Sequence, residues 1–292
     1  MAEKIETVAA VHAQLGEGSF WDAQQKALYW LDIEGKKLFI FHPRSGENRA
    51  YDIGEKIGTV VPKRSGGLLL ALEGSLAEFI PETGILRKLL PLEADIPENR
   101  SNDGKCDPAG RFWIGSMAPE EKTGGASLYR VEKDYSVRRI LSDLTISNGL
   151  AWNADGTRMY HIDTPTRRVS VFDYDLKTGE ICNKKVCLEI PLGRGFPDGM
   201  TIDAEGMLWI ALFQGWGVSR WDPETGRMLC VVEMPVKNIT SCAFGGENLD
   251  ELYVTSARIL NTEEELARQP QAGNLFRLKP GVCGVPLPAF SG

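Results

Sequence analysis

The stretch DPAGRFWI, residues 107–114, is one copy of a short pattern that decides the fold of this chain. It puts an aspartate at the start of a tight turn, a glycine three residues later, and a run of β-forming residues directly after the turn. Turns of the D-x-x-G type contain residues that tolerate a positive φ, and they join short antiparallel strands. Related copies begin at residues 22, 64, 153, 203 and 246, so the pattern extends along the whole chain.

The copies recur at a nearly constant spacing. One strand residue in each copy serves as a marker, and successive markers are 40, 44, 47, 49 and 44 residues apart: Tyr29, Leu69, Trp113, Tyr160, Trp209 and Tyr253. Short strands bounded by turns at such a period predict one four-stranded antiparallel sheet per repeat. We therefore predict an all-β fold, a single six-bladed β-propeller over residues 1–292. An irregular β-sandwich is the alternative, but a sandwich has no six-fold phase.

The ends of a propeller must be joined, and the stretch from Lys4 to Val11 is expected to add an outer strand to the last blade. Tryptophans recur at strand positions with the period of the repeat, which indicates packing between blades rather than stacking on a ligand. Helical periodicity is confined to a charged run near Thr262–Arg268, which is expected on the surface.

Composition and charge argue against several classes of function. The 292 residues carry a formal net charge of −7, and no run of Lys or Arg exceeds two residues, which disfavours nucleic-acid binding. No stretch approaches the roughly 20 apolar residues of a membrane span, and the segment from Met1 to Lys4 does not lead into the apolar core of a secretory signal. We predict a cytoplasmic protein without a nucleic-acid or membrane partner.

The phase of the repeat also predicts a site. In a propeller the innermost strand of each blade runs along the central channel, so residues of equal phase near its start form a ring. Five positions before the turn residues Asp22, Asp107, Asn153 and Asp203 stand, in that order, Glu17, Asn102, Asn148 and Asp198. Two carboxylates and one or two carboxamides suit a hard cation such as Ca²⁺, Mg²⁺ or Mn²⁺, with Fe²⁺ and Zn²⁺ as alternatives. The competing interpretation makes the Asn-Gly and Asp-Gly pairs mere turn residues at the strand entry.

Other catalytic chemistries have little support. None of the three histidines falls at the ring position, and the sequence contains no G-x-S-x-G elbow, P-loop or dinucleotide fingerprint. His161, in the strand pattern MYHID at 159–163, is expected to be a packed or hydrogen-bonded residue.

At the ring residues the sequence resembles the SMP-30/gluconolactonase family, whose members include regucalcin and bacterial sugar lactonases. The matching segments are LGEGSFW (15–21), NRSNDGKCD (99–107), PAGRFWIGSM (108–117), ISNGLAW (146–152), PDGMTIDAEG (197–206), CAFGG (242–246) and LYVTSAR (252–258). The similarity extends from about residue 6 to the end of the chain. The family is a six-bladed propeller with one divalent metal ion in its channel, so the resemblance supports the fold predicted from the repeat.

Carried over by motif, the resemblance implies that Glu17, Asn148 and Asp198 are metal ligands. It further implies that substrate is bound by Arg100, Asn102 and Glu120. The chain reads APEE at 118–121, so Glu121 is an alternative to Glu120.

The implied reaction is hydrolysis of a sugar lactone, of the gluconolactone or aldonolactone type, to its aldonic acid. Ca²⁺ is the first choice for the metal, and Asp198 is a candidate for general base as well as ligand. The alternatives are a regucalcin-like calcium-binding regulatory protein without catalysis and a protein-interaction propeller. The second and sixth repeats add no acid to the ring, and the lactone is expected on that open side.

Overall fold

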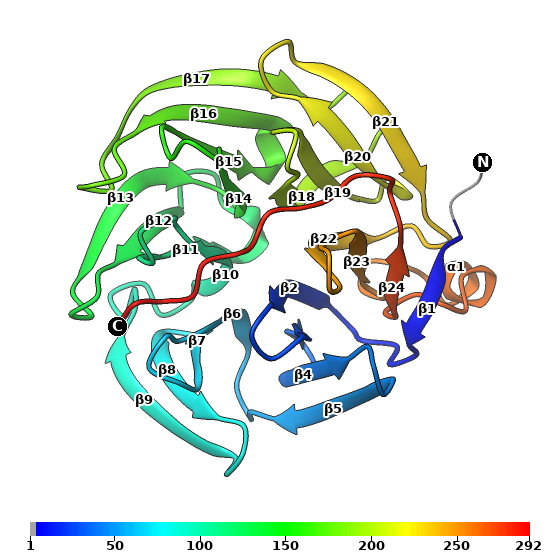
Figure 1. Ribbon diagram of the computed structural model, residues 1–292, viewed down its shortest axis with the longest axis horizontal. Coiled ribbons are helices and arrows are strands. Elements are labelled where there is room, and N and C mark those ends of the chain that lie inside the picture. Colours follow the sequence, from blue (N-terminus) through cyan, green and yellow to red (C-terminus); the bar gives the residue numbers. More distant parts are fainter. Residues whose placement is uncertain (1–3) are drawn as a thin grey trace.

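Each sequence repeat folds into a four-stranded antiparallel sheet, and the sheets are arranged as blades around a central axis (Figure 1). The computed structural model describes residues 4–292, and these residues form six blades. From the axis outward, blade 1 comprises β2 (Gly16–Asp22), β3 (Ala27–Asp32), β4 (Lys37–His42) and β5 (Glu47–Asp52). Blade 2 comprises, in the same order, β6 (Ile57–Pro62), β7 (Leu68–Leu72), β8 (Ser75–Ile80) and β9 (Ile85–Pro91). Blade 3 comprises β10 (Arg100–Cys106), β11 (Phe112–Met117), β12 (Ala126–Val131) and β13 (Val137–Leu144). Blade 4 comprises β14 (Ser147–Trp152), β15 (Arg158–Asp163), β16 (Arg168–Tyr174) and β17 (Ile181–Glu189). Blade 5 comprises β18 (Phe196–Ile202), β19 (Leu208–Phe213), β20 (Gly217–Asp222) and β21 (Arg227–Glu233). Blade 6 comprises β22 (Ile239–Gly245), β23 (Glu251–Ser256), β24 (Leu275–Leu278) and, as its outermost strand, β1 (Glu6–Ala9).

The six-bladed propeller predicted from the repeat is therefore confirmed. All six marker residues lie on the second strand of their blades. The innermost strands are almost wholly buried, whereas the outermost strands β5, β9, β13, β17 and β21 alternate between exposed and half-buried positions. This burial gradient is what radial packing of sheets requires.

The ring is closed by the N-terminal strand, as the sequence predicts. Strand β1 pairs antiparallel with β24 and becomes the outer strand of blade 6. Across the same seam, Trp21 of blade 1 stacks on Tyr253 of blade 6, with ring centroids 5.7 Å apart. Trp113 packs similarly against Trp152 of the next blade. The part of the N-terminal segment from residue 1 to residue 3 lies outside the described residues.

The turn aspartate of the repeat has a definite structural role. In blade 5, Asp203 Oδ1 accepts hydrogen bonds from two backbone N–H groups of its own turn, and Oδ2 accepts one from Trp209 Nε1 at 2.9 Å. Asp107 binds Trp113 in the same way at 2.9 Å. The aspartate side chain thus fixes both its own turn and the tryptophan of the next strand. This double role explains why the aspartate and the tryptophan occur together in these repeats.

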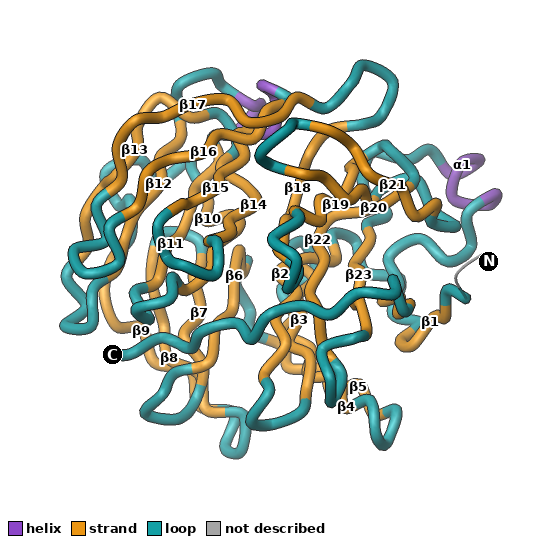
Figure 2. Tube along the Cα trace, turned by 45° about the horizontal axis from the view of Figure 1, so that its top comes forward, coloured by secondary structure: helices purple, strands orange, loops and turns teal. Residues whose placement is uncertain are grey.

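The last segment of the chain, residues 280–292, crosses the face of the propeller as a strap (Figure 1 and Figure 2). Its residues contact the turns that follow the innermost strands: Ala204 donates its N–H to Cys283 O, and Ser291 donates to Gly110 O. Phe290 is fully buried and packs edge-on against Tyr135. The strap therefore lies at the ends of the innermost strands, opposite the ring predicted at their starts.

The one α-helix within residues 4–292 is α1 (Glu263–Arg268), which Thr262 caps, as expected for this charged surface run. In the same described part of the chain, no helix combines the length and apolar character needed to cross a membrane.

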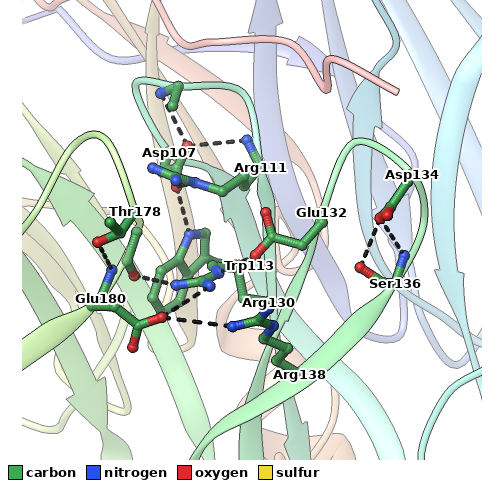
Figure 3. Close-up of polar contacts among 12 residues, drawn as sticks. Asp107, Arg111, Trp113, Arg130, Glu132, Asp134, Ser136, Arg138, Thr178 and Glu180 are labelled. Atoms are coloured by element: carbon green, nitrogen blue, oxygen red, sulfur yellow. Dashed lines mark hydrogen bonds and ion pairs between the residues drawn. The ribbon is translucent and has the colours of Figure 1, made fainter.

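Two buried arginines of blade 3 hold a turn of blade 4. Arg111 binds Asp107 through Nε (Figure 3). It also donates to the carbonyl oxygens of Leu176 and Lys177. Arg130 lies over the ring of Trp113 and donates to Gly179 O. The 175–179 turn is thus fixed by guanidinium groups that have little freedom to move.

We expect Gly179→Ala to destabilise the protein. Gly179 has a φ of +72°, and a Cβ there would lie 2.7 Å from Arg111 Cζ and 2.8 Å from an Arg130 nitrogen. Gly84 is a matched control, because its φ is +71° and nothing lies within 4 Å of its Cβ position. Gly84→Ala should lower the free energy of unfolding by about 1 kcal/mol through backbone strain alone. Gly179→Ala should cost about 1–3 kcal/mol more in urea titrations; equal losses would contradict the arginine clamp.

Candidate active site

A shared irregularity of the innermost strands shapes the centre of the molecule. Each of these strands shifts register against its neighbour near its start, within Glu17–Phe20, Ile57–Thr59, Ser101–Gly104, Ser147–Leu150, Pro197–Met200 and Ile239–Cys242. Such β-bulges re-aim side chains at barrel rims and active sites. The four predicted ring residues lie at these bulges, and all four line one cavity of about 230 Å³.

The cavity is lined from five of the six blades. Its walls are formed by Leu15, Glu17, Arg100, Asn102, Met117, Glu121, Ile146, Asn148, Thr164, Pro165, Phe196, Asp198, Phe213, Gln214, Ile259 and Leu260. Blade 2 contributes none of these residues, so the expectation of an open side there is wrong. A Cβ at Gly58 of blade 2 would lie 2.5 Å from Ser101 O, which means that the inner strands of blades 2 and 3 touch. On the side of blade 6 the cavity does extend, to Ile259 and Leu260.

The carboxamide of Asn148 is oriented by a neighbouring hydroxyl. Asn148 Nδ2 donates to Thr164 Oγ1 at 2.9 Å, and Thr164 Oγ1 donates in turn to Pro197 O at 2.8 Å. Pro197 precedes Asp198, so Thr164 connects two ring residues from blades 4 and 5. This contact leaves Asn148 Oδ1 as the atom available to the ring.

Asn102 and Arg100 form a second polar unit on blade 3. Asn102 Nδ2 donates to Ser147 O at 2.9 Å and to Asn148 Oδ1 at 3.2 Å. Arg100 Nη1 donates to Asn102 Oδ1 at 2.7 Å. Both functional atoms of the Asn102 carboxamide are therefore used within the protein, and Arg100 lines the cavity beside it.

The two ring carboxylates are almost completely buried and repel each other. Glu17 is 8% exposed and Asp198 7% exposed. Burial raises the pKa of Glu17 to about 8, and the charge of Asp103 acts in the same direction. Burial also raises the pKa of Asp198 well above its usual range, with a further contribution from the charge of Glu17. A buried carboxylate is stable in its ionised form only when a cation or several donors compensate it.

The donor set fits a hard divalent cation. The predicted set consists of two carboxylates and a carboxamide oxygen, whose residues all line the cavity. Among residues 4–292 no three His, Cys, Asp or Glu side chains come together as a metal cluster. Oxygen ligands of this kind are those that Ca²⁺ and Mg²⁺ prefer. The residues that would hold the ion are Glu17, Asn148 and Asp198.

The two glutamates of the APEE segment differ in position. Both have a positive φ of 53° and lie in a 3₁₀ turn, Pro119–Glu121, directly after β11. Glu121 lines the cavity, whereas Glu120 is outside its lining. The structure therefore brings Glu121, rather than Glu120, to Arg100 and the ring.

Two cavity residues, Thr164 and Gln214, were not predicted from the sequence. Each stands 16 positions after the ring residue of its blade, Asn148 or Asp198, directly after the second strand. The repeat phase that located the ring could have located them, because equal offsets from the ring reach the same end of each blade. His161, by contrast, is a buried hydrogen-bonding residue as expected, with its Nε2 2.9 Å from Ser147 Oγ.

Comparison with known proteins links this geometry to one family. The model of the SMP-30/Gluconolactonase/LRE-like region matches residues 15–258. Regucalcin of Gallus gallus is 38% identical over 99% of both chains. A protein of Bacillus subtilis (strain 168), YvrE, whose name assigns it provisionally to the sugar lactone lactonases, is 36% identical over 97% of both. A solved structure from Agrobacterium tumefaciens strain C58, described as a calcium-binding protein, regucalcin, superposes with a TM-score of 0.94 at 30% identity, covering 100% of this chain and 98% of that one.

Thr164→Val should destabilise the protein by about 1–3 kcal/mol, because it leaves a buried carboxamide N–H and the Pro197 carbonyl without a partner. Thr164→Ser keeps the hydroxyl and should lose less than half as much in the same urea titrations. Equal losses for the two variants would show that the methyl group, not the hydroxyl, is the part that matters.

Proposed function

Because the chain belongs to the SMP-30/gluconolactonase/LRE-like family, we propose that it is a lactonase that hydrolyses a sugar lactone to its aldonic acid. The reaction would take place in the axial cavity, with one divalent cation held by Glu17, Asn148 and Asp198. One observation carries the proposal: two buried carboxylates from different blades line a single small cavity that Arg100 lines as well.

When bound, a divalent cation supplies Lewis-acid polarisation of a carbonyl oxygen and lowers the pKa of water. Ca²⁺ is our first choice, because every donor is oxygen and because a structural relative is described as calcium-binding. Mg²⁺, Mn²⁺, Fe²⁺ and Zn²⁺ are the other ions to test.

The residues of the chain then have separate tasks. We assign Asp198 as the general base, since a carboxylate oxygen that is not used for binding can take a proton from the attacking water. Water adds to the lactone carbonyl carbon, the ring C–O bond breaks, and the proton passes to the ring oxygen as it leaves as a hydroxyl. Arg100 and Glu121 would bind hydroxyl groups of the sugar. Asn102 has its hydrogen bonds committed, so its task is to position Arg100 and Asn148.

The second candidate function is calcium binding without turnover, as in a regucalcin-like regulatory protein. The 38% identity to a regucalcin favours it. It would use the same three ligands but would need no arginine in the cavity. A panel of aldonolactones, assayed with EDTA-treated protein before and after addition of single ions, distinguishes the two. The cytoplasmic location stays a prediction.

Asp198→Asn should reduce kcat for lactone hydrolysis by at least about 100-fold, because a carboxamide cannot accept the proton. The affinity of the metal-free protein for Ca²⁺, measured by calorimetric titration with CaCl₂, should fall much less, since Asn keeps a ligand oxygen. Near-normal turnover by a variant that still binds Ca²⁺ would remove Asp198 from the role of base.

Glu17→Gln tests the metal site by stability alone. The metal-free variant should unfold at a higher urea concentration than the metal-free wild type, because one of two repelling buried charges is gone. Added CaCl₂ should stabilise the wild type and leave the variant nearly unchanged. Glu247→Gln, an exposed carboxylate in a surface turn, is the control and should follow the wild type. An equal response of all three proteins to CaCl₂ would exclude Glu17 as a ligand.

A further inference from the structure

The cavity has two unlike sides. The predicted ligands and Arg100 come from the inner strands and make one side polar. On the side of blades 5 and 6 the lining is largely apolar, with Phe196 at the start of β18, Phe213 at the end of β19 and Leu260 in the loop after β23. Leu260 is 67% exposed.

Gln214 is the exception on this apolar side. It lines the cavity, is half-buried, and its carboxamide makes no hydrogen bond to any other residue within 4–292. Its backbone has a φ of +59°, a conformation that non-glycine residues adopt at a cost and that concentrates at functional sites. A strained residue with an uncommitted amide in a cavity is available for a ligand.

The position of Gln214 in the repeat points to the same role. It has the phase of Thr164, which orients the ring residue of blade 4. In blade 5 the residue at this position, Gln214, has a longer side chain and makes no hydrogen bond to the ring residue Asp198, unlike Thr164 with Asn148. The same structural position therefore serves the protein in one blade and is free for substrate in the next.

The turn that carries Gln214 is held firmly. Gly215 donates its N–H to Leu212 O at 2.9 Å, and Trp216 donates to Lys237 O at 3.2 Å. A Cβ at Gly215 would lie 2.4 Å from Arg194 O, so the loop at 191–195 packs directly on the turn. A pre-organised amide loses little conformational freedom on binding, which favours specificity.

We propose that Gln214 determines specificity by hydrogen-bonding the terminal hydroxyl of the lactone, at the end remote from the carbonyl. Phe196 and Phe213 face the C–H surface of the same part of the substrate. The site thus selects a polyhydroxylated lactone with an intact hydroxymethyl end over its deoxy analogue. This inference rests on the proposed lactonase function.

The experiment compares D-glucono-1,5-lactone with its 6-deoxy analogue in steady-state assays of the full chain. For the wild type, KM for the deoxy analogue should be roughly 3- to 10-fold higher at similar kcat, the effect of one neutral hydrogen bond. Gln214→Ala should raise KM for the parent lactone by the same factor and leave KM for the analogue unchanged. Gln25→Ala, an exposed glutamine of a distant turn, should leave both values unchanged.

Gln214→Gly separates recognition from backbone strain. It removes the carboxamide but relieves the positive φ, so it should show the same loss of discrimination as Gln214→Ala. Wild-type KM values in the glycine variant, or a proportional change for both lactones in the alanine variant, would overturn the assignment. If the wild type hydrolysed no lactone of the aldonolactone panel with any of the five ions, the proposed function itself would fail, and this inference with it.

Discussion

All six innermost strands are bulged at the same position, and the site depends on that constraint. A regular strand would place alternate side chains between the blades, whereas the bulge brings one ring residue to the cavity in blades 1, 3, 4 and 5. The glycines that follow Asn148 and Asp198 belong to this arrangement. A Cβ at Gly149 would lie 2.8 Å from Asp198 O, and a Cβ at Gly199 would lie 2.8 Å from Thr240 O. Neither glycine has a positive φ, so they are not turn residues: they let neighbouring inner strands approach until their ring residues meet.

The close approach creates an electrostatic problem that the chain solves only in part. Glu17, Asp198 and Asp103 are all buried, and burial raises the pKa of each carboxyl group. The charge of Asp103 raises the pKa of Glu17 and Asp198 further, and the charge of Glu17 also acts on Asp198. The nearby Lys105 is buried as well, and its ammonium group donates to Met200 O at 2.6 Å rather than to a carboxylate. Polar burial of this kind is unfavourable for folding and is retained at functional sites. The divalent cation that we propose would compensate these charges.

The sequence predicted most of what repeats and little of what does not. The turn aspartate and the aromatic residue recur together in blades 1, 3 and 5 because the same side-chain contact recurs there, as between Asp203 and Trp209. The strap at 280–292 occurs once, so no internal copy could reveal that its Phe290 is buried. The choice between Glu120 and Glu121 depends on a 3₁₀ turn with two positive φ values, which no periodicity encodes. Thr164 and Gln214 are intermediate: their phase repeats, but their residue types differ between blades.

The lopsidedness of the ring has a physical cause in the packing of neighbouring inner strands. The propeller is closed within blade 6, where β1 pairs with β24, and the inner strands of blades 6 and 1 are held together by non-covalent contacts, as at every other seam. Thr240, the ring residue of blade 6, accordingly directs its hydroxyl to Gly16 O at 2.5 Å and to Thr255 Oγ1 at 2.8 Å. A carboxylate there would lose this contact and add a third charge beside Glu17. Blade 2 closes the ring differently, through the direct approach of Gly58 to the backbone of blade 3. Two of six equivalent positions therefore serve the architecture, and the cavity extends where blades 4, 5 and 6 leave their loops free to line it.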